Sequence, residues 1–246
     1  MSRVPPGDVS GGATPGGSAE RTSGAVPLQE RIVVFGAHPD DTEIGAGGTI
    51  AAYTRRGHRV VMVSLRVPGG KDDACHHDQE RRRNEGAAAA RTLGAEVLSF
   101  GLSRDAIQVN ARLVGAFDEL LKDVQPTAVY TQWLGDSHPE HVALSRAVLA
   151  ATRRNRCSVY MYEATLPGGI SPHAFRAQKF VDISDTIEQK MASLQCYETQ
   201  LDAYGQQWLE AIRGRAAHRG FQIGRRYAEA FQVVKDVAEI PDVRQP

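Results

Sequence analysis

A short acidic segment, from His38 to Glu43, places one imidazole and three carboxylates within six residues. It follows an apolar run at 32–36 and precedes a glycine-rich segment. Isolated carboxylates are costly to bury, so a strand that ends in such a cluster must deliver it to solvent or to a cation. The segment is therefore interpreted as half of a metal site.

A second cluster, His138-Pro139-Glu140-His141, lies about 100 residues later in the chain and follows another apolar run. His138 and His141 are three residues apart at an expected helix start, so their side chains share one face. Two imidazoles and one carboxylate form a three-ligand set of the kind that catalytic zinc sites use, with a position left for water. His38 and one of the two aspartates, Asp40 or Asp41, can supply ligands from the first cluster, and His141 from the second.

The composition indicates one soluble domain with a sizeable core. The 246 residues include 29 acidic and 29 basic side chains and are 41% hydrophobic, so net charge favours neither nucleic acid nor an anionic membrane as a partner. The three cysteines are far apart, which predicts reduced thiols in a cytoplasmic protein and not a disulfide framework. No apolar run is long enough to cross a membrane, and residues 1–28 lack the apolar core of a signal peptide.

Two segments differ sharply in composition. Residues 1–28 contain fourteen Gly, Pro or Ser residues. They include too few apolar side chains for burial to offset the entropy lost on ordering, so this segment is expected to be a disordered tail. Residues 29–240 alternate short β-branched runs with helical patterns and are expected to form one α/β domain of parallel strands joined by crossover helices.

The pattern of that domain predicts particular elements. Strands are expected at 31–36, 59–65, 96–100, 127–131, 158–162 and 179–183, with helices at about 45–56, 77–93, 113–124, 139–154, 187–201 and from 206, and a last segment at 227–234. The polar segment at 66–76 is expected to be a loop that covers the site. The size of the pocket depends on this loop and on 163–178, whose conformations the sequence leaves open, as it does the oligomeric state.

A doubly wound sheet of order 3-2-1-4-5 is the fold expected for this series of elements. In that order strands one and four are neighbours, and the loops that follow them diverge, which creates the crevice where such sheets bind ligands. The two polar clusters directly follow these two strands. Although they are far apart in sequence, we expect them to meet.

These motifs resemble those of a known family. Ala37-His38-Pro39-Asp40-Asp41-x-Glu43, then Ile-Gly-Ala-Gly-Gly-Thr at 44–49, together with His-Pro-Glu-His at 138–141, are similar to the LmbE-like, or PIG-L, family of zinc-dependent N-deacetylases. The likeness extends over about 31–234. It implies a single Rossmann-like, three-layer domain that removes the N-acetyl group from a small-molecule substrate, an amino sugar or a metabolite that contains one.

The resemblance also implies roles for the residues of the motif. His38, Asp41 and His141 would hold the metal, and Asp40 would be the general base that takes a proton from the metal-bound water. His138, protonated, would hold the developing oxyanion and assist the leaving amine. Zinc is the expected ion, and ferrous iron is the alternative because imidazole and carboxylate suit both.

Three features depart from the family's pattern. Thr42 stands where many members have an acid, and Glu43 is expected to be only a favourable charge near a helix N-terminus, with no catalytic role. The segment 64–70 differs from the family's usual sequence, which puts substrate contacts from that loop in doubt. Glu140 stands where relatives often have Asp, and it is expected either to orient His138 or to be a solvated charge.

The sequence also allows interpretations other than a metal site. A phosphate loop at Gly45–Gly48 lacks its third glycine, because Ile50 occupies that place, so the glycines are expected to allow close packing of the first helix. A non-catalytic sugar- or nucleotide-binding α/β domain remains the alternative function. The segment 75–78 is interpreted as a surface loop. Further residues are interpreted as pocket-lining (Tyr162, Trp133, Arg66) or as isolated histidines without a ligand role (His58, His173, His218).

Overall fold

A seven-stranded sheet forms the centre of the molecule in the computed structural model, which describes residues 29–66, 78–103, 106–164 and 170–238. The strands lie in the order β3-β2-β1-β4-β5-β7-β6, which confirms the predicted 3-2-1-4-5 core and adds two strands at one edge. Their bounds are β1 Arg31–Gly36, β2 Arg59–Ser64, β3 Glu96–Ser99, β4 Ala128–Gln132, β5 Ser158–Tyr162, β6 Lys179–Asp182 and β7 Ala228–Lys235.

The register of the strands brings the ends of β1 and β4 together. Ile32 of β1 pairs with Ala128 of β4, and Val34 pairs with Tyr130, in a parallel ladder. The other edge of β1 pairs in parallel with β2. Only β7 runs against its neighbours, β5 and β6. The predicted switch point between β1 and β4 is therefore present.

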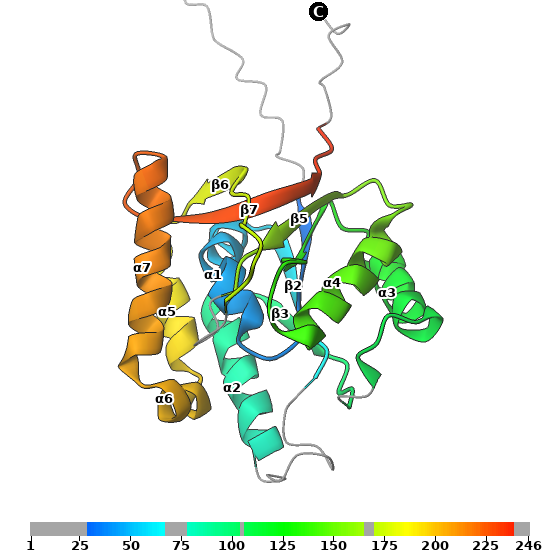
Figure 1. Ribbon diagram of the computed structural model, residues 1–246, viewed down its shortest axis with the longest axis horizontal. Coiled ribbons are helices and arrows are strands. Elements are labelled where there is room, and N and C mark those ends of the chain that lie inside the picture. Colours follow the sequence, from blue (N-terminus) through cyan, green and yellow to red (C-terminus); the bar gives the residue numbers. More distant parts are fainter. Residues whose placement is uncertain (1–28, 67–77, 104–105, 165–169, 239–246) are drawn as a thin grey trace, which may run out of the picture.

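Helices cover both faces of the sheet, as Figure 1 shows, with α3 and α4 on one side and α1, α2, α5 and α7 on the other. Successive residues of β1 alternate between the layers: Val33 and Phe35 pack with α3 and α4, whereas Ile32 and Val34 pack with α1. The bounds are α1 Asp41–Thr54, α2 Asp78–Leu93, α3 Ala111–Val124, α4 Pro139–Thr152, α5 Ile187–Gln195, α6 Glu198–Tyr204 and α7 Gln206–Gln222. The predicted three-layer α/β fold is correct.

Two predicted helices differ from the structure. The first begins at Asp41 and not at Gly45, because the acidic residues themselves form the first turn, where the helix dipole favours negative charge. The helix expected over 187–201 is interrupted at Cys196 and Tyr197 and continues as the separate helix α6. Because of this break, α5 and α6 are two separate helices.

Several predictions fall on residues outside the described ranges, among them the tail at 1–28, most of the loop at 66–76 and the segment 165–169. The 75–78 cluster also lies almost wholly outside them. Of the described cysteines, Cys157 and Cys196 are free thiols. The helices that are described are each too short or too polar to span a membrane.

Candidate metal centre

The turn after β1 has an unusual backbone. Asp40 has φ 105° and ψ −32°, a positive φ that residues other than glycine rarely adopt. The turn is closed by the amide of His38, which donates to Asp41 Oδ2 at 2.7 Å. Gly36 lies directly beneath it, where an added Cβ would come within 2.9 Å of the Asp41 Cβ. The turn thus points its two aspartates in different directions.

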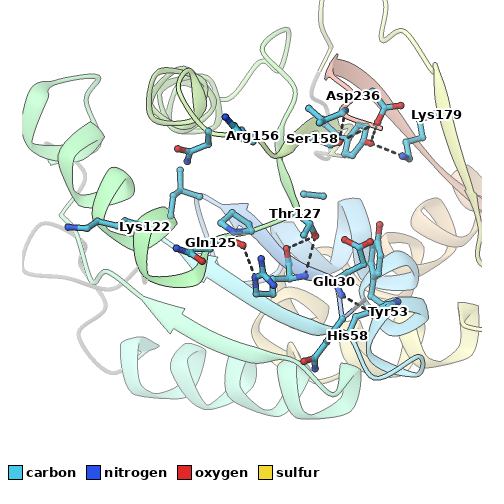
Figure 2. A pocket seen from close by; sticks show the side chains of 18 of the residues that line it. Glu30, Tyr53, His58, Lys122, Gln125, Thr127, Arg156, Ser158, Lys179 and Asp236 are labelled. Carbon is cyan, nitrogen blue, oxygen red and sulfur yellow. Dashed lines mark hydrogen bonds between the residues drawn. The ribbon is translucent and has the colours of Figure 1, made fainter. Parts of the chain in front are cut away.

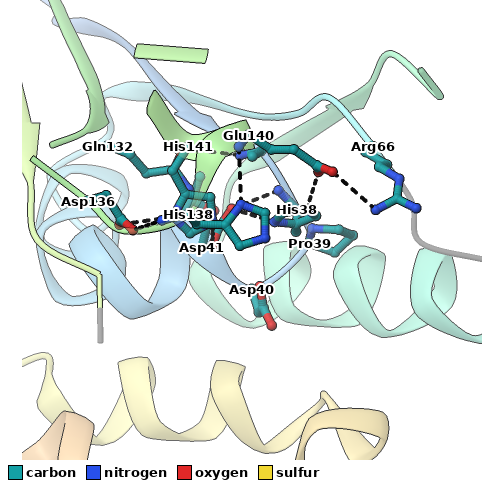
Figure 3. A network of polar contacts seen from close by, with 12 residues as sticks. His38, Pro39, Asp40, Asp41, Arg66, Gln132, Asp136, His138, Glu140 and His141 are labelled. Carbon is teal, nitrogen blue, oxygen red and sulfur yellow. Dashed lines mark hydrogen bonds and ion pairs between the residues drawn. The ribbon is translucent and has the colours of Figure 1, made fainter. Parts of the chain in front are cut away.

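Three potential metal ligands come together at the ends of β1 and β4. His38, Asp41 and His141 each offer one atom, and these atoms lie within 4.8 Å of one another (Figure 3). Asp41 stands between the imidazoles, with Oδ2 3.5 Å from His38 Nδ1 and Oδ1 3.3 Å from His141 Nε2. The predicted meeting of the two clusters is therefore correct, and these three residues could hold a metal.

Each imidazole of this group is bonded to a carboxylate through its other nitrogen. His141 Nδ1 lies 2.9 Å from Asp136 Oδ2, and His38 Nε2 lies 2.7 Å from Glu140 Oε2. Carboxylates in this position fix the tautomer and ring orientation of metal-binding histidines. The expectation that Glu140 orients His138 through its carboxylate is thus corrected: Glu140 reaches across to His38, because residues two apart on a helix do not face each other.

Asp136, which is not among the residues predicted for the site, lies two residues before His138 and bonds to the histidine cluster. Its Oδ2 contacts His141, and its Oδ1 accepts the backbone N–H of His138 at 2.8 Å. Arg66, predicted to line the pocket, is buried, with Nη1 3.5 Å from Glu140 Oε1. The sequence signal for Asp136 was its position two residues before the first histidine, but only the folded turn shows which atoms it bonds.

The electrostatics of the three residues suit a cation. Burial lowers the pKa of His38, but bonds to Asp41 and Glu140 outweigh it and raise the pKa to about 9. Burial alone raises the pKa of Asp41, yet His141 and His38 hold it well below its usual range. The pKa of His141 is likewise raised against burial by Asp41 and Asp136. The site favours positive charge, and its two imidazoles and one carboxylate match the donors that zinc prefers, so the residues fit a metal.

Asp40 points away from its neighbour Asp41, toward α2 and α6. Its carboxylate is buried, and Oδ2 lies 3.6 Å from Arg82 Nη2. Burial and the charge of Asp41 raise the pKa of Asp40 to about 7, although Arg82 opposes them. A carboxylate with this pKa can accept a proton near neutral pH.

His138 lies beside the other two histidines without joining their ligand set. Its ring stacks on His141 with centroids 4.5 Å apart, and its centroid is 5.0 Å from that of His38. It is the N-cap of α4, with Nδ1 accepting the Glu140 N–H at 3.2 Å. Burial and the two other imidazoles lower the pKa of His138, so the geometry favours a neutral ring with its proton on Nε2 over the protonated form expected from the resemblance.

Glu43 lies in the first turn of α1, as expected for a charge near a helix N-terminus, but its side chain is buried and bonded. It is only 1% exposed, and it accepts hydrogen bonds from Tyr197 at 2.5 Å and from Thr42 at 2.7 Å. Burial raises its pKa. Glu43 therefore ties the first turn of α1 to the segment before α6.

The glycines after the acidic turn do allow close packing, as predicted. A Cβ at Gly45 would lie 2.0 Å from the ring of Tyr162, and one at Gly48 would lie 2.7 Å from Ile183. Tyr162 is fully buried and donates to the carbonyl of Phe35, so it does not line an open pocket. The glycines therefore let α1 settle onto the sheet, and a phosphate loop is not needed to explain them.

Cavities lie at both ends of the sheet. One of about 230 Å³ is lined by His38 and Pro39 of the turn together with Arg82 and Tyr197. A second, of about 450 Å³, is lined by Trp133, one of the residues predicted to border a pocket. A third, of about 1150 Å³, lies at the opposite end of the strands (Figure 2).

This far cavity contains none of the predicted site residues. Its polar side chains bond one another: Tyr160 donates to Asp236, Lys179 donates to Tyr160 at 2.7 Å, and His58 Nδ1 accepts the backbone N–H of Glu30 at 3.1 Å. His58 thus has a structural bond, in line with its predicted lack of a ligand role. Volume alone does not make this cavity the candidate site.

Comparisons with known proteins agree with the site. The family model described as PIG-L, GlcNAc-PI de-N-acetylase, matches residues 33–152, which include both clusters. The chain is 30% identical over 130 residues to the uncharacterized deacetylase YaiS of Escherichia coli K12, covering 50% of this chain and 68% of that one. It is 27% identical over 237 residues to the diacetylchitobiose deacetylase of Thermococcus kodakarensis, covering 85% and 84% of the two chains.

A solved structure with a different activity has the same fold. The 4-carboxy-2-hydroxymuconate hydratase GalB of Pseudomonas putida KT2440 superposes with a TM-score of 0.73 at 22% identity, over 86% of this chain and 99% of that one. At this identity the similarity concerns the fold alone. The reaction must therefore be argued from the side chains of the site.

Proposed function

The chain belongs to the PIG-L, or LmbE-like, family, and from that premise we propose that it is a metal-dependent hydrolase that removes the N-acetyl group from an amino sugar or a metabolite containing one. The observation that carries the proposal is the convergence of His38, Asp41 and His141 within 4.8 Å, with a second, separately directed carboxylate on Asp40. The named activity of the Thermococcus relative supports an N-acetylated sugar as the substrate class.

His38, Asp41 and His141 would hold the metal, His38 through Nδ1 and His141 through Nε2, since Glu140 and Asp136 engage the other nitrogens. Zinc is the proposed ion, with ferrous iron as the alternative. When bound, the metal supplies a Lewis acid that lowers the pKa of water and polarises the amide carbonyl.

Asp40 acts as the general base. Oδ2 faces Arg82, so Oδ1 is the oxygen that takes the proton from the attacking water. The water oxygen forms a bond to the amide carbon, and the C–N bond breaks. Asp40 then returns its proton to the leaving nitrogen, so that acetate and a free amine are released and the carboxylate is restored.

His138 stabilises the charge that develops on the carbonyl oxygen. Its Nδ1 is an acceptor at the start of α4, which leaves the Nε2–H as the donor. A neutral imidazole with its proton on Nε2 serves as a hydrogen-bond donor in this position.

The proposal is tested first by metal content. Purified full-length protein is expected to contain one zinc or iron per chain and to lose it in His38→Ala, whereas His218→Ala, an exposed histidine on α7, keeps it. Protein without a stoichiometric metal, and without any response to His38→Ala, contradicts the hydrolase proposal and leaves the non-catalytic binding domain.

Activity separates the two aspartates. Acetate release from N-acetylglucosamine and diacetylchitobiose is measured for metal-loaded and metal-stripped protein. Asp40→Asn is expected to keep its metal and lose about 100- to 10,000-fold in kcat, whereas Asp41→Ala loses metal. If both variants keep metal and rate, the assignment is wrong.

The remaining expectations stay predictions from the sequence. Balanced charge favours a small molecule over nucleic acid or a membrane as the partner, and the isolated cysteines favour the cytoplasm. The unassigned 230 Å³ cavity beside the turn is a further reason to screen N-acyl sugars of different sizes.

A further inference from the structure

The backbone of Asp40 has a positive φ, a conformation that is unfavourable for residues other than glycine. Within the described residues, only Asp40 and Gln125 have a positive φ without being glycine. Gln125 caps the end of α3, where this conformation is common, but Asp40 stands at the start of α1. Such a residue persists only where surrounding groups fix it.

Arg82, on α2, is one of the groups that fix it. Its Nη2 lies 3.6 Å from Asp40 Oδ2 and donates to the carbonyl of Pro39 at 3.2 Å. One guanidinium therefore reaches both the side chain of the proposed base and the peptide just before it. Rotation of Asp40 away from this position would break the contact.

Gln200, on α6, is the second group. With its amide oriented to match its neighbours, its nitrogen donates to Asp40 Oδ2 at 3.1 Å and its oxygen accepts from Arg82 Nη1 at 2.6 Å. The reverse orientation would place oxygen against the carboxylate and nitrogen against the guanidinium. Gln200 is 8% exposed, so water does not readily replace these bonds.

The two helices that carry Arg82 and Gln200 are tied together. Glu85, one turn after Arg82, accepts the backbone N–H of Thr199 at 3.0 Å and its hydroxyl at 2.6 Å. Thr199 directly precedes Gln200. Arg82 and Gln200 therefore contact Asp40 together, because they bond to each other and the helices that carry them are joined by hydrogen bonds.

We propose that Gln200 and Arg82 are positioning residues that hold the carboxylate of Asp40 for proton transfer, with Oδ2 clamped and Oδ1 left for the water. The inference rests on the proposed function, since it needs Asp40 to be the base. Neither residue belongs to the predicted set of metal ligands and catalytic groups. The positioning role requires that the effect of Gln200 on the reaction passes through Asp40.

The test substitutes Gln200 in the full-length, metal-loaded protein. Gln200→Met keeps the length of the side chain and removes both hydrogen bonds, and it is expected to lower kcat about 10- to 100-fold, the scale of a misplaced catalytic group. The KM is expected to change less than about twofold, and the metal content to stay at one per chain.

Gln189→Met is the matched control. Gln189, on α5, accepts from Arg55 at 2.9 Å and donates to the carbonyl of Thr92 at 2.8 Å, so it also joins helices through both ends of its amide, but away from the turn. Its substitution is expected to leave kcat unchanged. Gln200→Leu, which removes both hydrogen bonds with a shorter apolar side chain and adds no charge beside Asp40, replaces Gln200→Met if that variant does not fold.

A double-mutant cycle decides whether the effect passes through Asp40. In the Asp40→Asn background Gln200→Met should lower the residual rate by less than about twofold. Unfolding of the metal-free chain gives a second readout, in which the effects of Asp40→Ala and Gln200→Met should not add. Additive effects in both cycles, or an unchanged kcat in Gln200→Met, overturn the positioning role. An Asp40→Asn variant as active as the wild type instead overturns the proposed function.

Discussion

Two buried charged groups contact helix α1, one at its start and one in its middle. In the middle, Lys190 Nζ lies 2.5 Å from Glu229 Oε1 and donates to the carbonyl of Ile44 at 2.9 Å. Glu229 also accepts the backbone N–H groups of Gly48 and Thr49 at 2.9 and 2.7 Å. We call this group the Lys190–Glu229 pair.

The two groups differ in how their charge is compensated. In the Lys190–Glu229 pair the two opposite charges face each other and backbone groups of α1 bond to both side chains, while Arg215 donates to the same Ile44 carbonyl as Lys190. At the start of α1 the carboxylates are in excess. Asp41 and Glu140 stabilise the protonated imidazole of His38 and raise its pKa to about 9. A buried charge that other groups of the protein compensate contributes to the structure. A buried cluster with more negative than positive charge can bind a cation and is therefore a candidate functional site.

Breaking the Lys190–Glu229 pair should have the largest effect on stability. Lys190→Met removes the cation that lies 2.5 Å from the buried Glu229 carboxylate and is expected to lower the free energy of unfolding by about 3 to 5 kcal/mol. Because the pair needs no metal, urea titrations should give the same loss with and without zinc. Lys122→Met, on the exposed face of α3, is the control with little effect. A loss that zinc abolishes would mean that the two groups are not separate.

The pH dependence of the metal-free chain should reveal the other group. The pKa of His38 is raised from 6.5 to about 9 in the folded state, so its stabilisation is complete below about pH 6.5 and is lost as pH rises through about 9. The shift corresponds to an upper limit of roughly 3 kcal/mol. Thermal unfolding between pH 6 and 10 should show the decline without metal and a much flatter profile with zinc, which replaces the proton. If the dependence of thermal unfolding on pH is the same with and without zinc, the start of α1 does not differ from the Lys190–Glu229 pair in its need for a cation.

Removing one supporting carboxylate should weaken the metal without unfolding the chain. Glu140→Gln keeps the shape of the side chain that contacts His38 and is expected to reduce metal affinity about 10- to 100-fold. Competition with a chromophoric chelator measures this affinity. Glu210→Gln, exposed on α7, provides the control. An unchanged affinity would show that Glu140 only neutralises Arg66.

The smallest effect concerns the backbone of Asp40. Asp40→Gly and Asp40→Ala both remove the carboxylate, but only glycine adopts φ 105° without strain, so the glycine variant should be more stable by about 1 to 2 kcal/mol. At Glu119, exposed in the middle of α3, the order should reverse, because glycine is unfavourable within a helix. Chemical denaturation of the four metal-free variants measures both differences. The same order at both positions would contradict strain at the turn.

Local patterns were sufficient to predict the parallel strands and the two clusters that carry the candidate ligands, while the choice of Asp41 over Asp40 came from the family resemblance. The strand predicted at 31–36 is β1 to the residue, and Pro139 occupies the first turn of α4 as predicted. The parallel order then places the loops after β1 and β4 at one point, which is why His38 and His141 could be expected to meet from 100 residues apart.

Helix boundaries near the site were harder to predict for physical reasons. The start of α1 depends on a backbone conformation at Asp40 that only its surroundings fix, and the break before α6 falls in a segment whose apolar spacing fits a single helix. The partners of Glu140 and Glu43 were also missed. Each carboxylate bonds a residue more than 100 positions away, and no local spacing reports such a contact.

The acidic turn and the histidine cluster were therefore determined by sequence alone, because residue type and strand order specify which donors gather at one edge of the sheet. The tertiary structure decided how they are used: which nitrogen of each imidazole faces Asp41, and which helices hold Asp40. These choices depend on hydrogen-bond geometry between elements distant in the chain, where a shift of about an ångström breaks the bond.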